Sequence, residues 1–276
     1  MLTRIITAIV ALCIFVPVCI FSNTIVMEVA MAVLNVVAVY ELWHCVRGTA
    51  ENPHQIGSFT LWIPHVVVAA GGVFLPWFFG QQAMHTLFLA LFLLLLYTFA
   101  VVVFSRGKIQ ITDAAVLMMM TLYVTASFTS ILCLRRGESG AHLFLLPFIG
   151  AWVSDTFAYF TGRLLGKHKL IPEVSPKKTV EGAVGGILFT GIAYGIFGAI
   201  IGVTGTGLVL LVCSGFIISV ISQIGDLIAS VVKRYYGIKD YGKLFPGHGG
   251  VMDRFDSVIA TAPVLYTISI LFPTML

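Results

Sequence analysis

The sequence predicts an all-α polytopic membrane protein, with the N-terminus in the cytoplasm and the C-terminus outside. Composition is the first reason: of 276 residues, 59% are hydrophobic and 10% are charged, whereas soluble domains are about 45–50% apolar. The second reason is that long apolar stretches recur along the whole chain, and crossing a hydrocarbon core takes about 20 residues. The third reason is where the basic residues fall between these stretches.

About nine transmembrane helices are expected from the apolar stretches, each near the length of a membrane span. The predicted spans are 3–21, 24–44, 58–79, 84–105, 114–134, 141–162, 180–203, 207–232 and 257–275. The first span follows Arg4, as the apolar region of a signal peptide would, but it lacks a small-residue cleavage site and more spans follow. We therefore interpret it as a transmembrane helix.

Positive charges set the predicted orientation. With nine spans and a cytoplasmic N-terminus, Arg135 and Arg136 are the only members of the 16 Lys and Arg residues in outside segments. The cytoplasmic segments hold the others, Arg47 among them. An excess of Lys and Arg on one side marks the cytoplasmic face of a membrane protein.

Cysteine and histidine give no sign of a disulfide framework or a zinc site. The five cysteines have no paired spacing, and most of them lie in predicted spans, where cysteine serves as a small apolar residue. Most histidines, including His54, are scattered singly without metal-ligand spacing. Nothing in the sequence indicates a soluble domain.

The chain is expected to form a single integral membrane domain, 1–276, with its charges concentrated in the second half. Two predicted cytoplasmic connectors, 163–179 and 233–256, hold most of the basic residues and lie on the same side of the membrane. We therefore expect 1–134 to be scaffold spans and 141–276 to carry the catalytic site.

Two carboxylates fall inside predicted spans, Asp155 and Asp226. A charge at membrane depth costs roughly 2.5–3.5 kcal/mol on insertion scales and usually faces the bundle interior with a partner. Asp226 also belongs to a polar stripe with helical spacing, made of Ser219, Ser222, Gln223, Asp226, Ser230, Lys233 and Arg234. Polar packing between helices explains the serines, but it does not call for an anion, so a functional role is favoured for Asp226. For Glu28 and Glu41 a structural role is favoured instead.

The connector "KDYGKLFPGHGGVMDRFDS", 239–257, combines acids, bases and glycines. Asp253 and Asp256 are three residues apart, so in a helix both carboxylates project from one face. Two close carboxylates call for a cation, and Mg²⁺ is commonly held by one or two carboxylates together with substrate phosphates. Asp226 could supply a third ligand.

The glycines of this connector indicate phosphate binding. Pro246, Gly247, Gly249 and Gly250 make a tight loop, whose backbone N–H groups could approach a phosphate. His248 lies between the glycines. Five cations surround the loop in the sequence: Lys233, Arg234, Lys239, Lys243 and Arg254. The alternative is a sharp turn back into the membrane.

The other connector rich in basic residues continues into the next predicted helix with the sequence "VSPKKTVEGAVGG", which also predicts an anion site. Lys177 and Lys178 precede a predicted helix that Thr179 could cap, and a helix N-terminus beside two lysines favours anions. In that helix Gly182/Gly186, Gly191/Gly195 and Gly198/Gly202 have small-xxx-small spacing. This spacing predicts close helix packing.

The stretch "SVVKRYYGIKDYGKLFPGHGGVMDRFDS", Ser230 to Ser257, resembles the signature of the phosphatidate cytidylyltransferases, also called CDP-diacylglycerol synthases. The upstream "SDTFAYFTGRLLGK", "SPKKTVEG" and "QIGDL" resemble other blocks of that family, so the resemblance covers the chain from Ser154 onward. The N-terminal spans match only in hydrophobicity.

The resemblance implies that CTP and phosphatidate give CDP-diacylglycerol and pyrophosphate, with Mg²⁺ required and a second metal ion as an alternative. The implied metal ligands are Asp226, Asp253 and Asp256, with Asp155 and Asp240 as further ligands or second-sphere partners. Lys239, Arg254 and His248 join the three aspartates in the expected catalytic set. The expected substrate-binding set is Ser230, Lys177, Lys178, Lys233, Arg234, Lys243, Gly247, Gly249 and Gly250.

The expected location is a bacterial-type cytoplasmic membrane, with the active site facing the cytoplasm. The expected partners are CTP, phosphatidate and the bilayer, with a homodimer and without nucleic acid. One rival is a CTP-dependent kinase of a polyprenol or phytol, which would need a base for its hydroxyl acceptor. A more distant rival is a cation-coupled transporter, although the chain lacks the internal repeat that is common in transporters.

Overall fold

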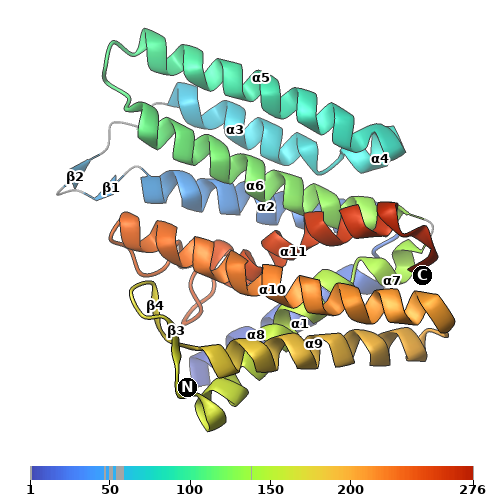
Figure 1. The fold of residues 1–276 in the computed structure, drawn as a ribbon. Coiled ribbons are helices and arrows are strands. Elements are labelled where there is room, and N and C mark those ends of the chain that lie inside the picture. The colour runs from blue at the N-terminus through green and yellow to red at the C-terminus, as the bar shows by residue number, and fades with distance from the viewer. Residues whose placement is uncertain (1, 47, 50–51, 54–58, 138, 276) are drawn as a thin grey trace. The chain divides into compact units, whose positions relative to one another are not determined.

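The computed structural model describes the whole chain except residues 1, 47, 50–51, 54–58, 138 and 276 (Figure 1). Arg47, His54 and the start of the predicted span 58–79 therefore lie outside the described residues. Among the described residues, seven helical segments are long and apolar enough to cross a membrane. They comprise α2 (Ile25–Val46), α5 (Ala83–Phe104), α6 (Ile111–Arg136), α7 with α8 (Gly140–Leu143 and Leu146–Leu165), α9 (Val180–Ile200), α10 (Gly205–Tyr235) and α11 (Met252–Leu271).

The remaining elements are two further helices of 19 and 14 residues and several short segments. They are α1 (Leu2–Ile20), α3 (Phe59–Gly72), α4 (Leu75–Phe79), the 3-10 helices η1 (Gly80–Gln82) and η2 (Pro273–Met275), and the strands β1 (Gly48–Thr49), β2 (Asn52–Pro53), β3 (Lys169–Ile171) and β4 (Ser175–Thr179). Two antiparallel pairs, β1–β2 and β3–β4, are the strand pairings of the described chain. The architecture fits the predicted all-α polytopic membrane class. Nine spans and the orientation of the termini stay predictions.

Several predicted boundaries were wrong. The segment 58–79 is not one helix, because α3 ends at Gly72 and a second helix, α4, begins just before Pro76. Proline is tolerated in the first turn of a helix, where its missing N–H has no partner to lose. The last long helix, α11, begins at Met252 instead of 257. The backbone N–H groups of Val251 and Met252, at this start, donate to the distant carboxylate of Glu41.

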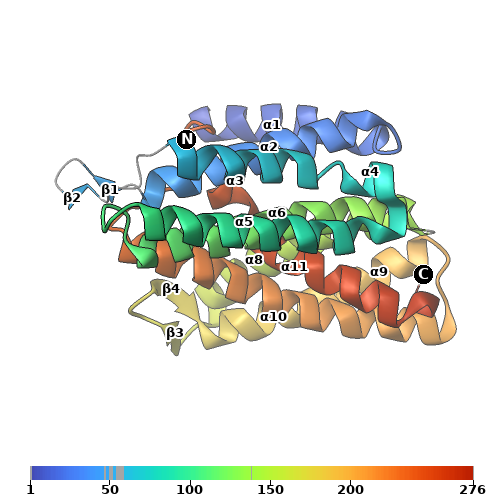
Figure 2. The same cartoon turned by 90° about the horizontal axis from the view of Figure 1, so that it is seen from above.

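The chain divides into two compact units. Unit 1 consists of Met1–Arg136 and Tyr235–Arg254, and unit 2 consists of Gly137–Arg234 and Phe255–Leu276. Within unit 1, α2 packs against α3 and α6, α5 packs against α3 and α6, and α1 contacts α2 (Figure 2). Much of the connector 239–257, called the signature connector below, therefore packs with the N-terminal helices.

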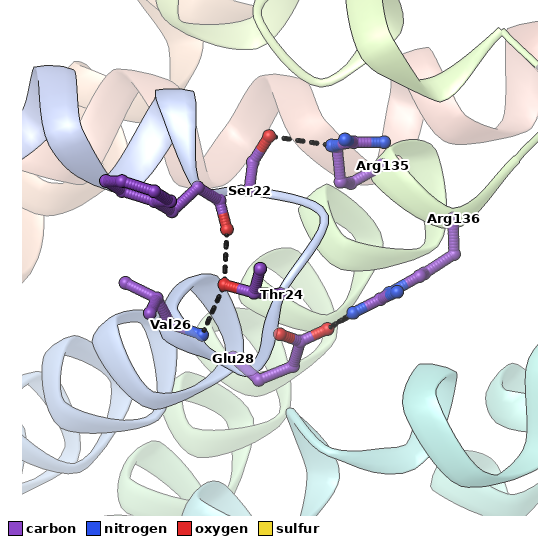
Figure 3. Close-up of polar contacts among 7 residues, drawn as sticks. Ser22, Thr24, Val26, Glu28, Arg135 and Arg136 are labelled. Atoms are coloured by element: carbon purple, nitrogen blue, oxygen red, sulfur yellow. Dashed lines mark hydrogen bonds and ion pairs between the residues drawn. The ribbon is translucent and has the colours of Figure 1, made fainter.

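A buried polar network ties together the parts of unit 1 where α2 begins and α6 ends (Figure 3). The Glu28 side chain is fully buried and forms an ion pair with Arg136, whose Nε donates to Glu28 Oε1 at 3.0 Å. The Arg136 guanidinium also lies over the Trp77 ring, 4.2 Å from its centroid. Arg135 Nε donates to Ser22 Oγ at 2.8 Å. These contacts join the α1–α2 turn, α2, α4 and α6.

Glycines bring the helices of unit 2 close together. A Cβ on Gly182 would lie 2.6 Å from the carbonyl oxygen of Ala158, and one on Gly186 would lie 3.0 Å from that of Ser154. These contacts seat α9 against α8, as the glycine spacing predicted (Figure 1). Gly202 is an exception, because its φ of +83° places it in the turn after α9, where a Cβ would meet nothing within 4 Å.

Candidate functional site

In unit 2, one carboxylate on α10 lies beside another on α11. A Cβ on Gly225 would lie 2.5 Å from Ala260 Cβ and 2.7 Å from the carbonyl oxygen of Asp256. Since a side chain at 225 would collide with α11, glycine permits this approach, and it places Asp226 next to the turn that carries Asp256. Two carboxylates on adjoining helices form a local concentration of negative charge.

Further charged and polar groups surround this pair. Asp155 on α8 and Lys233 on α10 lie within electrostatic reach of Asp256, as does Asp226. Ser257 connects Asp256 with Asp155: its N–H donates to Asp256 Oδ1 at 2.8 Å, and its hydroxyl donates to Asp155 Oδ2 at 3.4 Å. Three predicted site acids thus gather at one place in unit 2, and Asp155 is the most exposed of them.

A lysine from the connector 163–179 forms an ion pair with one of these carboxylates, Asp226. Lys178 on β4 places its Nζ 2.5 Å from Asp226 Oδ2 and 3.5 Å from the carbonyl oxygen of Gln223. Both partners of the ion pair are partly buried. The sequence predicted a role for each residue but not this contact. Lys177, its neighbour on the strand, is exposed.

The hairpin that holds Lys178 is fixed at both of its ends. β3 and β4 pair antiparallel, with Lys169 opposite Thr179. Thr179 then caps α9, since its side chain accepts a hydrogen bond from Gly182 N at 3.2 Å, as predicted. Glu181 binds back to the start of the hairpin through His168 Nδ1 at 2.6 Å and Lys167 N at 3.1 Å.

The polar stripe of α10 is largely used for packing. Ser219 Oγ lies 2.8 Å from Ser154 Oγ on α8, and Gln223 Nε2 donates to the carbonyl oxygen of Ala183 on α9 at 3.1 Å. These contacts fix the rotation of α10 relative to α8 and α9. They also leave Asp226 on the stretch of the stripe that faces Lys178.

In unit 1, the glycine loop is a tight turn stabilised by its own backbone. Phe245 N donates to the carbonyl oxygen of Gly249, and His248 N donates to that of Phe245, both at 2.8 Å. Gly247 and Gly249 have φ values of +78° and +88°, which L side chains rarely adopt. Glycine is therefore required by the turn itself at these two positions.

Asp253 holds this loop in place. Its Oδ2 accepts hydrogen bonds from Tyr241 N at 2.8 Å and Gly250 N at 3.0 Å, and the residue is 7% exposed. The Gly250 N–H, which the sequence suggested for phosphate binding, is thus used within the loop. A structural contact of this kind was not part of the prediction for Asp253.

Glu41 is the site neighbour that sequence reasoning missed. Its carboxylate is 4% exposed and accepts hydrogen bonds from Val251 N at 3.0 Å and Met252 N at 2.9 Å. An acid close to Trp43 and His44 looked like an ordinary interfacial residue. The sequence signal that could have identified Glu41 is a carboxylate in an apolar helix, which is also the reason that Asp226 was singled out.

The other predicted site residues are largely solvent-accessible. Ser230, Lys233, Gly247 and His248 are partly buried or exposed, and the exposed cations and acid are Arg234, Lys239, Asp240, Lys243 and Arg254. Their roles stay predictions.

The described residues contain no group of three or more His, Cys, Asp or Glu side chains that could hold a metal ion by protein ligands alone. The pair Asp226 and Asp256 offers hard oxygen donors, which suit Mg²⁺ when substrate phosphates complete its coordination. The donor chemistry therefore fits Mg²⁺ on two carboxylates.

Comparison with known proteins covers nearly the whole chain. A model described as "Cytidylyltransferase family" matches residues 2–272. A phosphatidate cytidylyltransferase of Staphylococcus haemolyticus is 35% identical over 266 residues, which is 96% of this chain and 97% of the relative. The protein of the same name from Staphylococcus saprophyticus is 36% identical over 271 residues, with the same coverage of each chain, and that from Staphylococcus aureus is 34% identical over 266 residues.

Proposed function

The chain belongs to the cytidylyltransferase family, and we propose that it transfers the CMP part of CTP to phosphatidate, giving CDP-diacylglycerol and pyrophosphate. One observation carries the proposal: relatives named phosphatidate cytidylyltransferase align with 96% of the chain. The resemblance that first suggested this family covered only the second half of the sequence. The match now includes the N-terminal helices.

The proposed reaction requires little general acid–base catalysis by the protein. The phosphate monoester of phosphatidate is ionised near neutral pH, so its oxygen attacks the α-phosphorus of CTP without a general base. A new P–O bond forms, the bond between the α-phosphorus and the bridging oxygen breaks, and pyrophosphate leaves with the electron pair. The protein must bring anions together, align them and stabilise the charge that develops on the leaving group.

We assign the metal to the paired carboxylates of unit 2, Asp226 and Asp256. Mg²⁺, when bound there, would neutralise charge on the triphosphate oxygens. Asp155 would act from the second sphere, because Ser257 links its carboxylate to the backbone next to Asp256. Outer partners of this kind orient metal ligands.

Lys178 would bind a substrate phosphate. Its ion pair with Asp226 keeps an ammonium group at the carboxylates, so an incoming phosphate meets a cation and not only negative charge. Lys233, which is in the electrostatic environment of Asp256, would add to this effect. Lysine suits the role because it offers a compact charge on a flexible stem.

The connector of unit 1 would bind phosphate groups of CTP. Gly247 and Gly249 keep that part of the loop free of side chains, and the exposed Lys239, Lys243 and Arg254 supply positive charge. His248 lies between these two glycines. The catalytic roles of His248, Lys239 and Arg254 rest on the resemblance alone.

A lipid substrate is consistent with a multi-pass protein. The relatives are bacterial, which supports a place in the cytoplasmic membrane, and the positive charges support a site that faces the cytoplasm, where CTP is made. In that position the phosphate of phosphatidate stays at the headgroup level while its acyl chains stay in the bilayer. A homodimer remains part of the proposal.

Two labels on CTP test this function. Purified protein in detergent with Mg²⁺ and phosphatidate should put the α-phosphorus label into the lipid and the γ-phosphorus label into pyrophosphate. The γ label in a lipid product, with polyprenol or phytol as acceptor, would instead establish the lipid kinase. An Asp256→Asn variant should lose nearly all transfer, whereas Glu28→Gln, which alters a buried acid of unit 1, should retain it once folded. Absence of lipid label in folded wild-type protein, across several phosphatidates and divalent metals, would overturn the proposal.

A further inference from the structure

Glu41 lies far from the signature connector in sequence and holds that connector in space. Its residue number differs by 210 from that of Val251, one of its two backbone donors. The second donor, Met252, is the first residue of α11. Each carboxylate oxygen accepts one of these N–H groups, so both oxygens are used.

The position suits a carboxylate in particular. The first N–H groups of a helix have no partner within the helix, and the helix dipole makes that end favourable for negative charge. Hydrogen bonds from backbone N–H to a carboxylate are roughly twice as strong as neutral ones. A glutamine could accept from one donor, but its amide nitrogen would face the other N–H group.

Two glycines of the connector are explained by the same carboxylate. A Cβ on Gly242 or on Gly250 would collide with the carboxylate of Glu41. Neither glycine has a positive φ among the backbone angles of the described chain, so turn geometry does not demand glycine there. These two glycines allow the backbone to pass close to Glu41.

Other N-terminal helices hold the same connector at different points. Thr7 on α1 donates its hydroxyl to the carbonyl oxygen of Pro246 at 3.0 Å. Near the start of the connector, Tyr236 packs against a core cluster that includes Val46 on α2 and Leu117 on α6. Burial and, after it, the charge of Asp113 raise the pKa of the Tyr236 phenol well above its usual range. The connector is thus held near its start, at its tip and at its end.

We propose that Glu41 is a positioning residue for cytidylyl transfer, which fixes the glycine loop and the first turn of α11. This inference rests on the proposed function, because α11 is also the helix on which Asp256 lies. Asp253 holds the inside of the loop through Tyr241 N and Gly250 N. Glu41 then anchors the loop to α2, so the N-terminal helices set the geometry of the signature segment.

The test compares Glu41→Gln and Glu41→Ala with Glu28→Gln. Glu28 is a matched control, because it is also a buried acid of α2 but pairs with Arg136. Each purified variant is examined by hydrogen–deuterium exchange of the peptides that cover 239–252, by thermal unfolding in detergent, and by steady-state kinetics with CTP and phosphatidate varied separately.

Glu41→Gln and Glu41→Ala should speed exchange in 239–252, while Glu28→Gln leaves that segment as slow as in the wild type. In the folded Glu41 variants kcat/KM for CTP should fall on the order of 100-fold, as expected when reacting groups move by about 1 Å. The KM for phosphatidate should change by less than about threefold, because the glycine loop is assigned to CTP in this scheme. Glu41→Gln should lose less than Glu41→Ala.

Two results would overturn the inference. One is unchanged exchange in 239–252, which would mean that Glu41 does not hold the loop. The other is a lower yield or melting temperature with wild-type kcat and KM in the folded fraction, which would make Glu41 purely structural. If wild-type protein makes no CDP-diacylglycerol, the proposed function and the link to this reaction both fail, and the exchange data alone decide whether Glu41 fixes the loop.

Discussion

The Nζ of Lys178 lies 2.5 Å from Asp226 Oδ2, so an ion pair ties strand β4 to helix α10. The lysine comes from a connector and the aspartate from a helix that is long and apolar enough to cross a membrane. Carboxylates at such depth usually have a partner, and here the partner is a residue suited to bind phosphate. The ion pair links the charge-rich connector 163–179 to the polar stripe of α10.

Replacing Lys178 by alanine should reduce kcat/KM strongly. Loss of one preorganised charge at a reacting centre costs on the order of 10² to 10³ in rate, and Asp226 would lose its cation. Initial rates of CDP-diacylglycerol formation measure the effect. Lys169→Ala is the control, because Lys169 lies on the same hairpin and donates to the carbonyl oxygen of Pro176. Equal losses in both variants would mean that the hairpin, and not the charge at 178, matters.

A methyl group at Gly225 should separate α10 from α11. Its Cβ would lie 2.5 Å from Ala260 Cβ and 2.7 Å from the carbonyl oxygen of Asp256, so the helices must move apart and Asp226 moves with α10. We expect Gly225→Ala to lower activity at least tenfold, since overpacking costs roughly 1–3 kcal/mol and displaces Asp226, a proposed metal ligand.

Gly71→Ala on α3 is the matched change, because a Cβ there would meet nothing within 4 Å. Alanine in a helix is favoured over glycine by about 1 kcal/mol, so this variant should melt at the same or a higher temperature with wild-type activity. Thermal unfolding and initial rates of both variants provide the comparison. A Gly225→Ala protein with wild-type activity would contradict the role given to this helix contact.

Local signals predicted the features that depend on a few neighbouring residues. Apolar runs located the long helices, Thr179 was expected to cap α9, and the glycines at 182 and 186 were expected to pack against another helix. Each of these follows from residues within one or two helical turns. The physical cause and the sequence signal lie in the same short segment.

Features set by distant residues escaped prediction. The span prediction began at 257 and treated the turn of Asp253 and Asp256 as helical only conditionally, whereas α11 begins at Met252, whose N–H donates to the distant carboxylate of Glu41. Likewise, separate roles were predicted for Lys178 and Asp226, because nothing in the local sequence around either residue shows that they touch. Asp253 was predicted as a metal ligand by its spacing from Asp256, and that role stays a prediction; the hydrogen bonds that its Oδ2 accepts from Tyr241 N and Gly250 N were not predicted.

The ion pair between Glu28 and Arg136 should stabilise the fold without serving the reaction. Removing one partner leaves the other charge uncompensated, and because Arg136 is partly exposed the cost should lie below the roughly 3–5 kcal/mol of a fully buried pair. Glu28→Gln and Arg136→Met should each lower the melting temperature, and the double variant should recover part of the loss. In all three variants, kcat of the folded protein should stay within about twofold of the wild-type value. Additive losses would show that the two side chains do not act as a pair.

The dependence of the reaction rate on Mg²⁺ should distinguish the proposed metal ligands, Asp226 and Asp256, from Asp155. We expect chelation of divalent cations to abolish cytidylyl transfer and added Mg²⁺ to restore it, because the triphosphate needs its charge neutralised. Asp256→Asn should reduce the rate by at least about 10³ at every Mg²⁺ concentration. Asp155 is exposed and connects to the site through Ser257, so Asp155→Asn should mainly raise the Mg²⁺ concentration for half-maximal rate, by about 10-fold.

Initial rates over a Mg²⁺ titration at saturating CTP distinguish these patterns. Ser257→Ala serves as the control for the connection, because it removes the hydroxyl that donates to Asp155 Oδ2 while the N–H that donates to Asp256 remains. That variant should show the same direction of change as Asp155→Asn, but a smaller one. If Asp155→Asn instead loses activity at saturating Mg²⁺ as completely as Asp256→Asn does, Asp155 binds the metal directly, and the pair of ligands proposed here must be extended to three.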